Sequence, residues 1–246
     1  MRSLIPYFGG KSKVVKWLLG LLPEHTHYVD PTFGGGSLLF ACSGEGRSEM
    51  VNDIDGDLMN FWRVVRDHAE WLERKASCIP FGYTSWVEAG KLMERACPDH
   101  RALGFFVRAR MSMCGSDTMK PLSKNATRRG MSKEVSAWWG SLPLVQPVAE
   151  RLARVALDNR PMLDVIQRED SPTTCFYLDP PYLPETRVKG GYRHEMTYED
   201  HEEMLDVLCQ AKGKVLLCGY ASDLYDTTLS HWERFEKPVK SYAGAK

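Results

Sequence analysis

The stretch 175–182, which reads CFYLDPPY, constrains the fold of this chain more than any other. Its apolar start, residues 175–178, is typical of a central parallel strand that is covered on both faces. Pro180 and Pro181 cannot donate ladder hydrogen bonds, so the strand must end there. The sequence therefore predicts that Asp179 and Tyr182 lie at the carboxyl edge of a sheet, where open α/β folds bind their ligands.

This predicted strand end suits the methylation of an aromatic amine. The exocyclic nitrogen of adenine or cytosine is a poor nucleophile, because its lone pair is delocalised into the ring. The Asp179 carboxylate and the Pro180 carbonyl can each accept one amino hydrogen and so aim the lone pair at an electrophilic methyl group. Tyr182 would stack on a base that has been flipped out of the helix. The structural alternative is a strand that simply ends in an Asp-Pro-Pro turn.

Composition sets the class of the protein. Its 246 residues predict one large domain or a core with an insertion, and 43% hydrophobic and 26% charged residues are ordinary for a globular protein. The formal net charge is zero, so a nucleic-acid surface would have to be a local patch. The seven cysteines form no C-x-x-C pair, which argues against a zinc site or a disulfide framework and favours a reducing cytoplasm. We see no signal peptide or membrane span.

A second ligand-binding pattern lies near the amino terminus. Residues 27–37 read HYVDPTFGGGS and predict a strand, a glycine loop and then a helix, the unit that cradles nucleotide-like ligands. The loop offers Phe33, Gly34 and Gly36 as cofactor contacts, since glycine lets the backbone approach a ligand closely. A second predicted strand, 50–55, carries Asp53, which can accept both ribose hydroxyls. The loop lacks the lysine-serine ending of a P-loop, which disfavours phosphate cleavage.

Residues 57–150 break this alternation of strands and helices. The pattern predicts helices over 57–75, 84–96 and 102–113 and no strand. The window 101–135 has eight basic residues and two acids, so it predicts a surface that binds phosphates, with a solvated charged face as the alternative. From this window we predict as DNA contacts Arg108, Arg110, Lys120, Lys124, Arg128 and Arg129.

The sheet pattern resumes after residue 150. Strands are predicted over 154–159, 175–178 and 214–220, the last apolar enough to be central, and an edge strand over 232–239. Helices are predicted over 11–22 and 162–167, and a capped helix begins after Thr197.

The segment 183–196 follows the predicted strand end directly. It combines a glycine pair with cations and an aromatic ring, so we expect a lid that closes over the flipped base when DNA binds, with Lys189, Tyr192 and Arg193 contacting the DNA. An ordinary surface loop is the alternative.

Four motifs in order give the chain a family resemblance: PYFGGK at 6–11, DPTFGGGS at 30–37, NDI at 52–54 and DPPY at 179–182. Together they resemble the Dam-like alpha group of DNA adenine methyltransferases, particularly its phage and prophage members, over nearly the whole chain. Tyr7 stands where Dam has tryptophan, and relatives usually run on past residue 246 into another edge strand. The resemblance implies that S-adenosylmethionine is bound by Tyr7, Lys11, Asp30, Asp53 and Asp179. It also implies that Asp179, Pro180 and Tyr182 hold a flipped adenine.

We therefore expect an α/β fold, a Rossmann-like S-adenosylmethionine-dependent methyltransferase sheet with a helical insertion. Residues 1–56 and 151–246 would form the catalytic domain, and 57–150 would recognise the DNA target. The expected reaction is site-specific methylation of the adenine 6-amino group in double-stranded DNA by base flipping, which yields S-adenosylhomocysteine without a metal. We expect a monomer in the cytoplasm of a bacterial or phage-infected cell, in restriction–modification or phage DNA methylation. Amino-methylation of cytosine, an inactive DNA-binding relic, and an RNA or protein methyltransferase remain alternatives.

Overall fold

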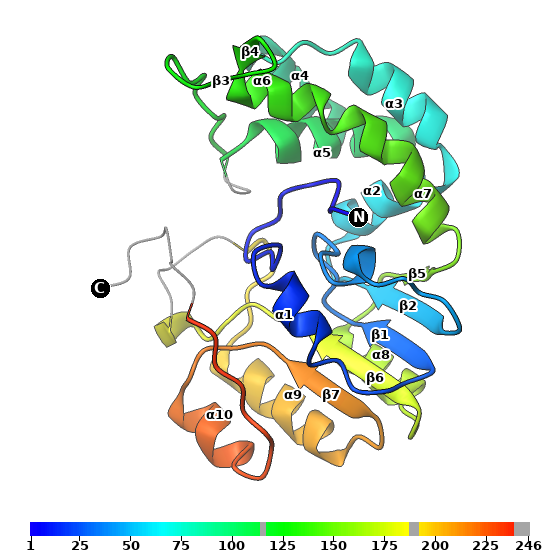
Figure 1. Cartoon of the computed structure of the whole chain (residues 1–246), viewed down its shortest axis with the longest axis vertical. Helices are drawn as coiled ribbons and strands as arrows, with labels where there is room; N and C mark the ends of the chain where they lie inside the picture. Colours follow the sequence, from blue (N-terminus) through cyan, green and yellow to red (C-terminus); the bar gives the residue numbers. More distant parts are fainter. Residues whose placement is uncertain (114–116, 187–191, 239–246) are drawn as a thin grey trace.

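The centre of the protein is a parallel β-sheet. A computed structural model describes residues 1–113, 117–186 and 192–238 (Figure 1). In the described part of the chain the sheet has the strand order β5-β2-β1-β6-β7, and every pair is parallel. The strands are β1 (His27–Asp30), β2 (Ser48–Asn52), β5 (Ala156–Asp158), β6 (Thr174–Leu178) and β7 (Lys214–Leu217). This is the expected α/β fold with a Rossmann-like parallel sheet.

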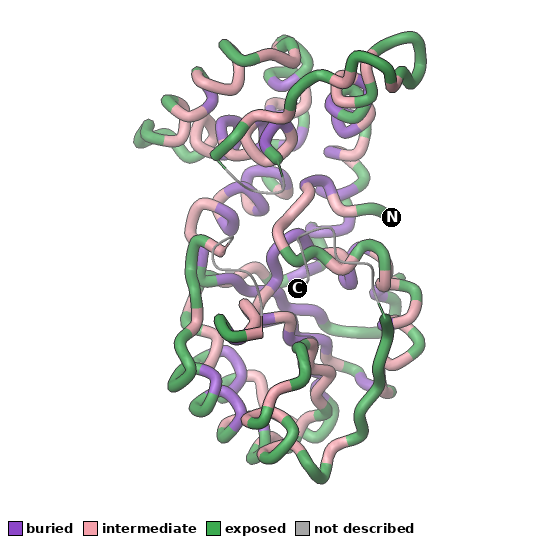
Figure 2. The backbone as a smooth tube through the Cα atoms, turned by 90° about the vertical axis from the view of Figure 1, so that its left-hand side faces the viewer, coloured by how far each residue is buried: buried purple, intermediate pink, exposed green. Residues whose placement is uncertain are grey.

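Alternate side chains of the strands enter two different apolar clusters, because successive residues of a strand point to opposite faces. Tyr28, Val51 and Tyr177 belong to the cluster on one face. Val29 and Phe176 belong to the cluster on the other. Every residue of β6 is buried, which explains why its sequence is apolar throughout. Figure 2 shows the resulting band of buried backbone through the middle of the molecule.

Short helices cover the two faces of the sheet. One face packs against α8 (Met162–Glu169) and α9 (Tyr198–Gln210), and α10 (Asp223–Thr228) follows β7. The predicted cap of α9 is present: Asp200 N donates to Thr197 Oγ1 over 3.2 Å, and Thr197 N donates to Asp200 Oδ2 over 2.7 Å. The other face carries α1 (Val15–Leu19) and a single 3₁₀ turn, η1 (Leu39–Ala41). A further 3₁₀ turn, η3 (Pro184–Thr186), follows β6.

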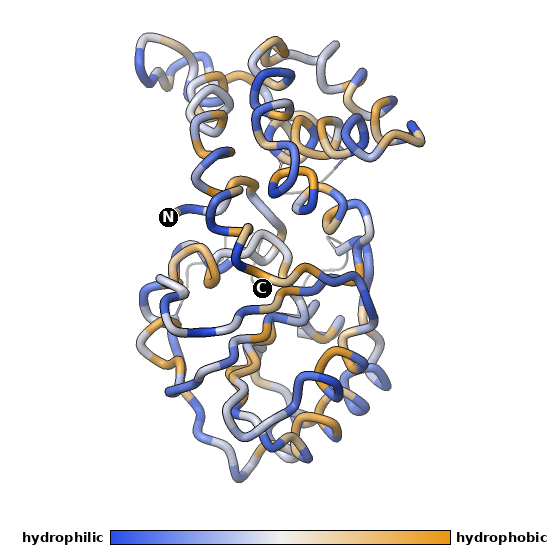
Figure 3. Tube along the Cα trace, turned by 90° about the vertical axis from the view of Figure 1, so that its right-hand side faces the viewer, coloured by the Kyte–Doolittle hydropathy of each residue, from blue (hydrophilic) through white to orange (hydrophobic). Residues whose placement is uncertain are grey.

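The chain between β2 and β5 forms a helical layer above the sheet (Figure 1). Its helices are α2 (Gly56–Asp67), α3 (Ala69–Ser77), α4 (Tyr83–Met93), α5 (Pro98–Met111), α6 (Lys133–Trp139) and α7 (Val145–Leu152), with a 3₁₀ turn, η2 (Leu142–Leu144), before α7. Buried aromatic rings of α2, α5 and α6 pack together, with Phe61 5.8 Å from Phe106 and Phe106 5.4 Å from Trp138 between ring centroids. These rings belong to the same apolar cluster as Tyr28 of the sheet, so the helical layer and the sheet share a core. Hydrophobic and hydrophilic positions both occur along these helices in Figure 3, as expected for helices with one buried side.

The prediction that residues 57–150 contain no strand is wrong. Strands β3 (Thr127–Arg128) and β4 (Met131–Ser132) pair antiparallel as a small hairpin. Its two turn residues, Arg129 and Gly130, have φ values of 56° and 74°. Positive φ at both positions is the geometry of the tight two-residue hairpin turn. Two-residue strands are too short to show a periodic pattern.

Four further predictions differ from the structure. The helix predicted over 11–22 is shorter, since α1 ends at Leu19 and Gly20 caps it. The helix expected after the glycine loop is only the turn η1. The strand β7 lies at the edge of the described sheet and not at its centre. Residues 232–238 form no strand, and 239–246 lie outside the described residues.

A buried ion pair joins the helical layer to the sheet. Arg151 of α7 donates to both carboxylate oxygens of Glu49 on β2, with N···O distances of 2.6 and 2.7 Å. The two side chains are 8% and 3% exposed. In this desolvated setting neither charge could be left without its partner at low cost. Within the described residues, no helix combines the length and apolar character that crossing a membrane requires.

Arg151→Met should destabilise the fold strongly, because the Glu49 charge stays buried without its partner while much of the side-chain volume is kept. Breaking a buried pair in this way costs about 3–5 kcal/mol of unfolding free energy. Urea unfolding followed by circular dichroism measures the change. Arg234→Met is the control, since Arg234 pairs with Asp226 at the surface, where both side chains are about half exposed, and should cost less than about 1 kcal/mol. Equal losses in the two variants would contradict the structural role of Arg151.

Candidate active site

Three carboxylates meet at the carboxyl edge of the sheet. Asp30 ends β1, and Asp53 and Asp179 follow β2 and β6, the strands on either side of β1. The parallel register brings these three strand ends to one edge of the sheet, as the sequence predicted for Asp179. Asp30 and Asp179 line a cavity there together with Tyr7, Phe8, Gly10, Lys11, Thr32, Phe33, Gly34, Gly35, Gly36, Ser37, Leu38, Tyr177 and Tyr192.

Asp179 makes hydrogen bonds with three residues. Lys11 Nζ lies 2.5 Å from its Oδ1 and 2.6 Å from its Oδ2. Its backbone N–H donates to Thr32 Oγ1 over 2.9 Å, and the Tyr182 hydroxyl donates to Oδ1 over 3.3 Å. Burial raises the pKa of the Asp179 carboxyl above its usual value, and the Lys11 charge opposes that rise. The carboxylate is therefore a positioned acceptor with the Lys11 cation directly beside it.

Tyr182 stands beside this carboxylate with its ring in an aromatic and cationic setting. Lys11 Nζ lies 5.0 Å from the centroid of the Tyr182 ring, and Tyr220 meets that ring edge-on with centroids 4.8 Å apart. Burial raises the pKa of the Tyr182 hydroxyl, so it stays protonated. Pro180, between Asp179 and Pro181, is buried. The corner thus brings a carboxylate and an aromatic ring together, with Pro180 as the next residue of the chain.

The other two acids are satisfied by backbone N–H groups. Asp30 is 1% exposed and accepts a hydrogen bond from Thr32 N over 3.2 Å. Asp53 accepts from Gly34 N over 2.9 Å and from Asp55 N over 3.0 Å. Burial raises the pKa of both carboxyls, and these N–H donors counteract the rise.

The glycine loop between β1 and η1 is shaped by close contacts. A Cβ atom on Gly34 would lie 2.9 Å from Tyr7 Cδ1, and Gly34 has a φ of 50°, so only glycine fits there without strain. The Gly34 carbonyl accepts a hydrogen bond from Trp62 Nε1 over 3.1 Å. Phe33 packs on the Trp62 ring with centroids 5.5 Å apart. The helical layer thus fixes the loop through α2.

Comparison with known proteins identifies the family. The family model described as D12 class N6 adenine-specific DNA methyltransferase matches residues 7–79 and 135–240. The chain belongs to this family. It is therefore an adenine-specific DNA methyltransferase. This excludes the alternative cytosine, RNA and protein substrates. The family implies S-adenosylmethionine as the methyl donor.

Two relatives extend the match over most of the methyltransferase. The chain is 23% identical over 239 residues to the type II methyltransferase M1.LlaDCHI of Lactococcus lactis subsp. cremoris, covering 91% of this chain and 83% of the relative. It is 24% identical over 225 residues to the DNA N-6-adenine-methyltransferase of Escherichia phage P1, covering 85% of this chain and 28% of the relative. The family model does not include residues 80–134, which hold α4, α5 and the β3–β4 hairpin.

The predicted DNA contacts of the methyltransferase fall into two groups. Lys124, Arg128 and Arg129 are exposed, the last two on the hairpin. The others are engaged within the protein. Arg108 pairs with Asp117 and lies 3.7 Å over the Trp86 ring. Arg110 donates to the carbonyls of Leu4 and Ala137, and Lys120 Nζ donates to the Arg110 carbonyl over 3.1 Å. Burial lowers the pKa of Arg110 to about 10.

The segment predicted as a lid is described in part. Lys189 lies outside the described residues, as do its neighbours from 187 to 191. Tyr192 lies against Phe8, edge-on with ring centroids 4.7 Å apart. Arg193 donates to Asp57 Oδ2 over 2.6 Å and to Asp55 Oδ1 over 3.3 Å. Tyr192 thus lines the cavity, whereas Arg193 pairs with acids at the start of α2.

Sequence reasoning missed several residues of the site. Thr32 and Tyr220 each follow an apolar strand run by a few residues, so the strand-end rule could have found them. Asn159, whose Nδ2 donates to the Asp53 carbonyl over 2.7 Å, also follows a strand, β5. Trp62 gave no such signal, because its role depends on the packing of α2 against the glycine loop.

Proposed function

We propose that this methyltransferase acts on a specific sequence in double-stranded DNA and flips the target adenine into the corner of Asp179, Pro180 and Tyr182. The observation that best supports this proposal is the position of the Asp179 carboxylate, which follows β6, lies beside Tyr182 and lines the cavity. That geometry offers two acceptors for an amino group and a flat surface for a base.

The reaction follows from these acceptors. The Asp179 carboxylate and the Pro180 carbonyl each take one hydrogen bond from the adenine amino group, so its lone pair points away from the ring plane. When bound, S-adenosylmethionine would supply an electrophilic methyl group on its sulfonium, and the electron pair of the broken C–S bond would stay on the sulfur of the neutral thioether S-adenosylhomocysteine. As the new N–C bond forms, the nitrogen gains positive charge, which the Asp179 carboxylate stabilises until one N–H proton passes to surrounding water. Lys11 now occupies both Asp179 oxygens, so it must yield one of them to the amine.

The cavity residues fit the cofactor. Gly34 lies close to the Tyr7 ring, and Asp30 lines the cavity. Asp53 does not line it, but accepts a hydrogen bond from the Gly34 N–H of the loop that does. We assign cofactor binding to the predicted set Tyr7, Lys11, Asp30, Phe33, Gly34, Gly36, Asp53 and Asp179. Asp53 would accept the ribose hydroxyls, and Tyr7 and Phe33 would flank the flat parts of the cofactor. We propose that no metal takes part.

The DNA would lie on the face with the exposed cations. Lys124, Arg128 and Arg129 are free of the buried contacts that hold Arg110. A two-stranded β-ribbon is narrow enough for the major groove of DNA. Residues 80–134 fall outside the family match, as expected if this part sets the target sequence. We propose that the enzyme works as a monomer in the cytoplasm of a bacterial or phage-infected cell.

Asp179→Ala should abolish methylation, because the amine loses its main acceptor. Loss of a positioned polar group at a reacting centre costs about 100-fold or more in rate, or about 3 kcal/mol. The assay incubates the protein with labelled S-adenosylmethionine and mixed-sequence DNA, then measures N6-methyladenine by nucleoside mass spectrometry. Asp226→Ala, on exposed α10, should keep full activity. Near wild-type turnover in the Asp179 variant would refute the assignment.

Lys11→Met should move the acid limb of the kcat/KM profile to higher pH. Asp179 must be ionised to accept the amine, and burial already raises its pKa, so activity falls as the pH drops through that value. Lys11 lowers this pKa, hence its removal raises the pKa further. Lys16→Met, on the exposed side of α1, should leave the limb in place. A limb that stays fixed, or moves to lower pH, would show that Asp179 does not control it.

Neutralising Arg128 and Arg129 together should weaken DNA binding and flatten its salt dependence. The logarithmic slope against salt concentration should fall by about one unit for each phosphate that the protein no longer neutralises. Fluorescence anisotropy at several salt concentrations provides the measurement. The double variant Arg74→Ala/Lys75→Ala removes the same charge from adjacent exposed positions on α3. If both doubles gave the same slope, the DNA would lie elsewhere.

A further inference from the structure

Two consecutive residues after the catalytic strand, Tyr192 and Arg193, contact the cavity and the start of α2, respectively. Tyr192 lines that cavity, and its ring meets Phe8 of the amino-terminal loop. A Cβ atom on Gly9 would lie 2.4 Å from the Tyr192 hydroxyl, so glycine at position 9, with φ of 73°, leaves the room that the hydroxyl takes. Tyr192 is therefore part of the cavity wall.

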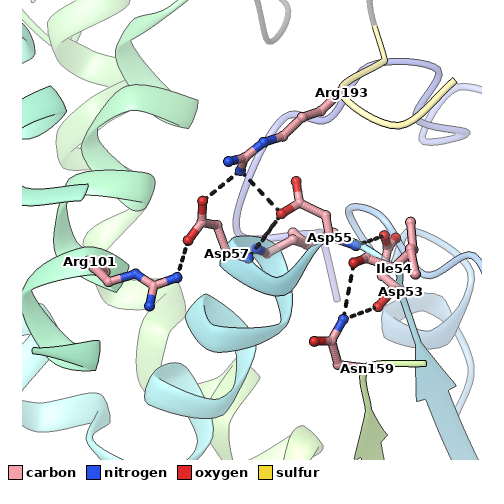
Figure 4. A network of polar contacts seen from close by, with 8 residues as sticks. Asp53, Ile54, Asp55, Asp57, Arg101, Asn159 and Arg193 are labelled. Carbon is pink, nitrogen blue, oxygen red and sulfur yellow. Dashed lines mark hydrogen bonds and ion pairs between the residues drawn. The ribbon is translucent and has the colours of Figure 1, made fainter. Parts of the chain in front are cut away.

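The next residue, Arg193, makes ion pairs outside the cavity lining. Its guanidinium pairs with Asp55 and Asp57 at the start of α2, and these acids are 6% and 16% exposed (Figure 4). Burial alone would raise the pKa of Asp57, but hydrogen bonds from Arg101 and Arg193 lower it below its usual value. The lowered pKa keeps Asp57 ionised beside the Arg193 guanidinium.

Asp55 and Asp57, the two acids that pair with Arg193, follow Asp53 closely at the start of α2. Asp55 N donates to Asp53 Oδ1, and the Asp55 side chain caps α2 by accepting from the backbone N–H groups of residues 57 and 58. Asn159 Nδ2 donates to the carbonyls of Asp53 and Ile54 over 2.7 and 3.2 Å. Figure 4 shows this turn between Asn159 and Arg193. Arg193 therefore contacts Asp55, whose backbone N–H hydrogen-bonds to Asp53, the proposed ribose acceptor.

We propose that Arg193 is a positioning residue of the cofactor pocket, which holds Tyr192 in the cavity wall and fixes the turn that carries Asp53. This role rests on the proposed cofactor site and differs from the DNA contact that the sequence predicted for Arg193. The ion pairs with Asp55 and Asp57 engage the guanidinium within the protein. Asp57 also accepts a hydrogen bond from Arg101 of α5, so the same acid ties this turn to the helical layer.

The test measures cofactor and DNA binding separately in Arg193→Gln. Calorimetry should show an S-adenosylmethionine dissociation constant raised about three- to tenfold, the scale of a partly exposed pair. The salt slope of DNA binding should stay at its wild-type value. Arg193→Lys should recover part of the affinity, since lysine keeps the charge but not the planar fork. Arg234→Gln, an equally exposed arginine that pairs with two acids near α10, should change neither quantity.

Two further variants test the route of the effect. Asp57→Asn should weaken cofactor binding in the same direction, and Arg193→Gln should add little on that background, because coupled residues are not additive. Tyr192→Ala should weaken cofactor binding as well, whereas Tyr192→Phe keeps the ring on Phe8 and should retain most of it.

The outcomes separate this inference from the proposed function. A wild-type protein that binds no S-adenosylmethionine would refute the proposed cofactor site itself. If the wild-type protein binds S-adenosylmethionine and the Arg193→Gln variant binds it with the same affinity, only the positioning role would be overturned. A reduced DNA salt slope with unchanged cofactor affinity would assign Arg193 to a phosphate instead. Additive effects of the Arg193 and Asp57 substitutions would also overturn the inference.

Discussion

Three carboxylates at one buried edge determine much of this structure. Asp30, Asp53 and Asp179 end or follow adjacent parallel strands, and burial raises the pKa of each. A buried charge is tolerated only where hydrogen bonds or opposite charges replace water. The glycine loop turns its N–H groups toward Asp30 and Asp53, and the amino-terminal loop brings Lys11 to Asp179. Both loops thus run where their backbone N–H groups or the Lys11 amine can compensate for the buried carboxylates.

The sequence predicted the parts of the site that depend on local chemistry. Pro180 and Pro181 ended β6 where expected, and the glycine loop and Asp53 lie at neighbouring strand ends. Partners distant in sequence were beyond such reasoning: Lys11 and Asp179 are 168 residues apart, and Arg193 and Asp57 are 136 apart. No local pattern carries information about such pairs.

The misplaced strand β7 shows a second limit. Its side chains pack on both faces of the sheet, with Val215 on one cluster and Leu216 on the other, which accounts for its apolar sequence. An apolar run reports what covers the faces of a strand, but not how many neighbours it has along the sheet. The hairpin at 127–132 was missed for a different reason. Each of its strands has only two residues, which is too short to show an alternation of apolar and polar side chains.

The sharing of Asp57 between Arg101 and Arg193 has a consequence for exchange between related enzymes. A recombinant that inherits α5 from a relative without an arginine at position 101 would leave Asp57 with one cation, and the turn beside the cofactor would lose a tether. Under the proposed role of residues 80–134 in target recognition, target preference and cofactor affinity are then not independent traits.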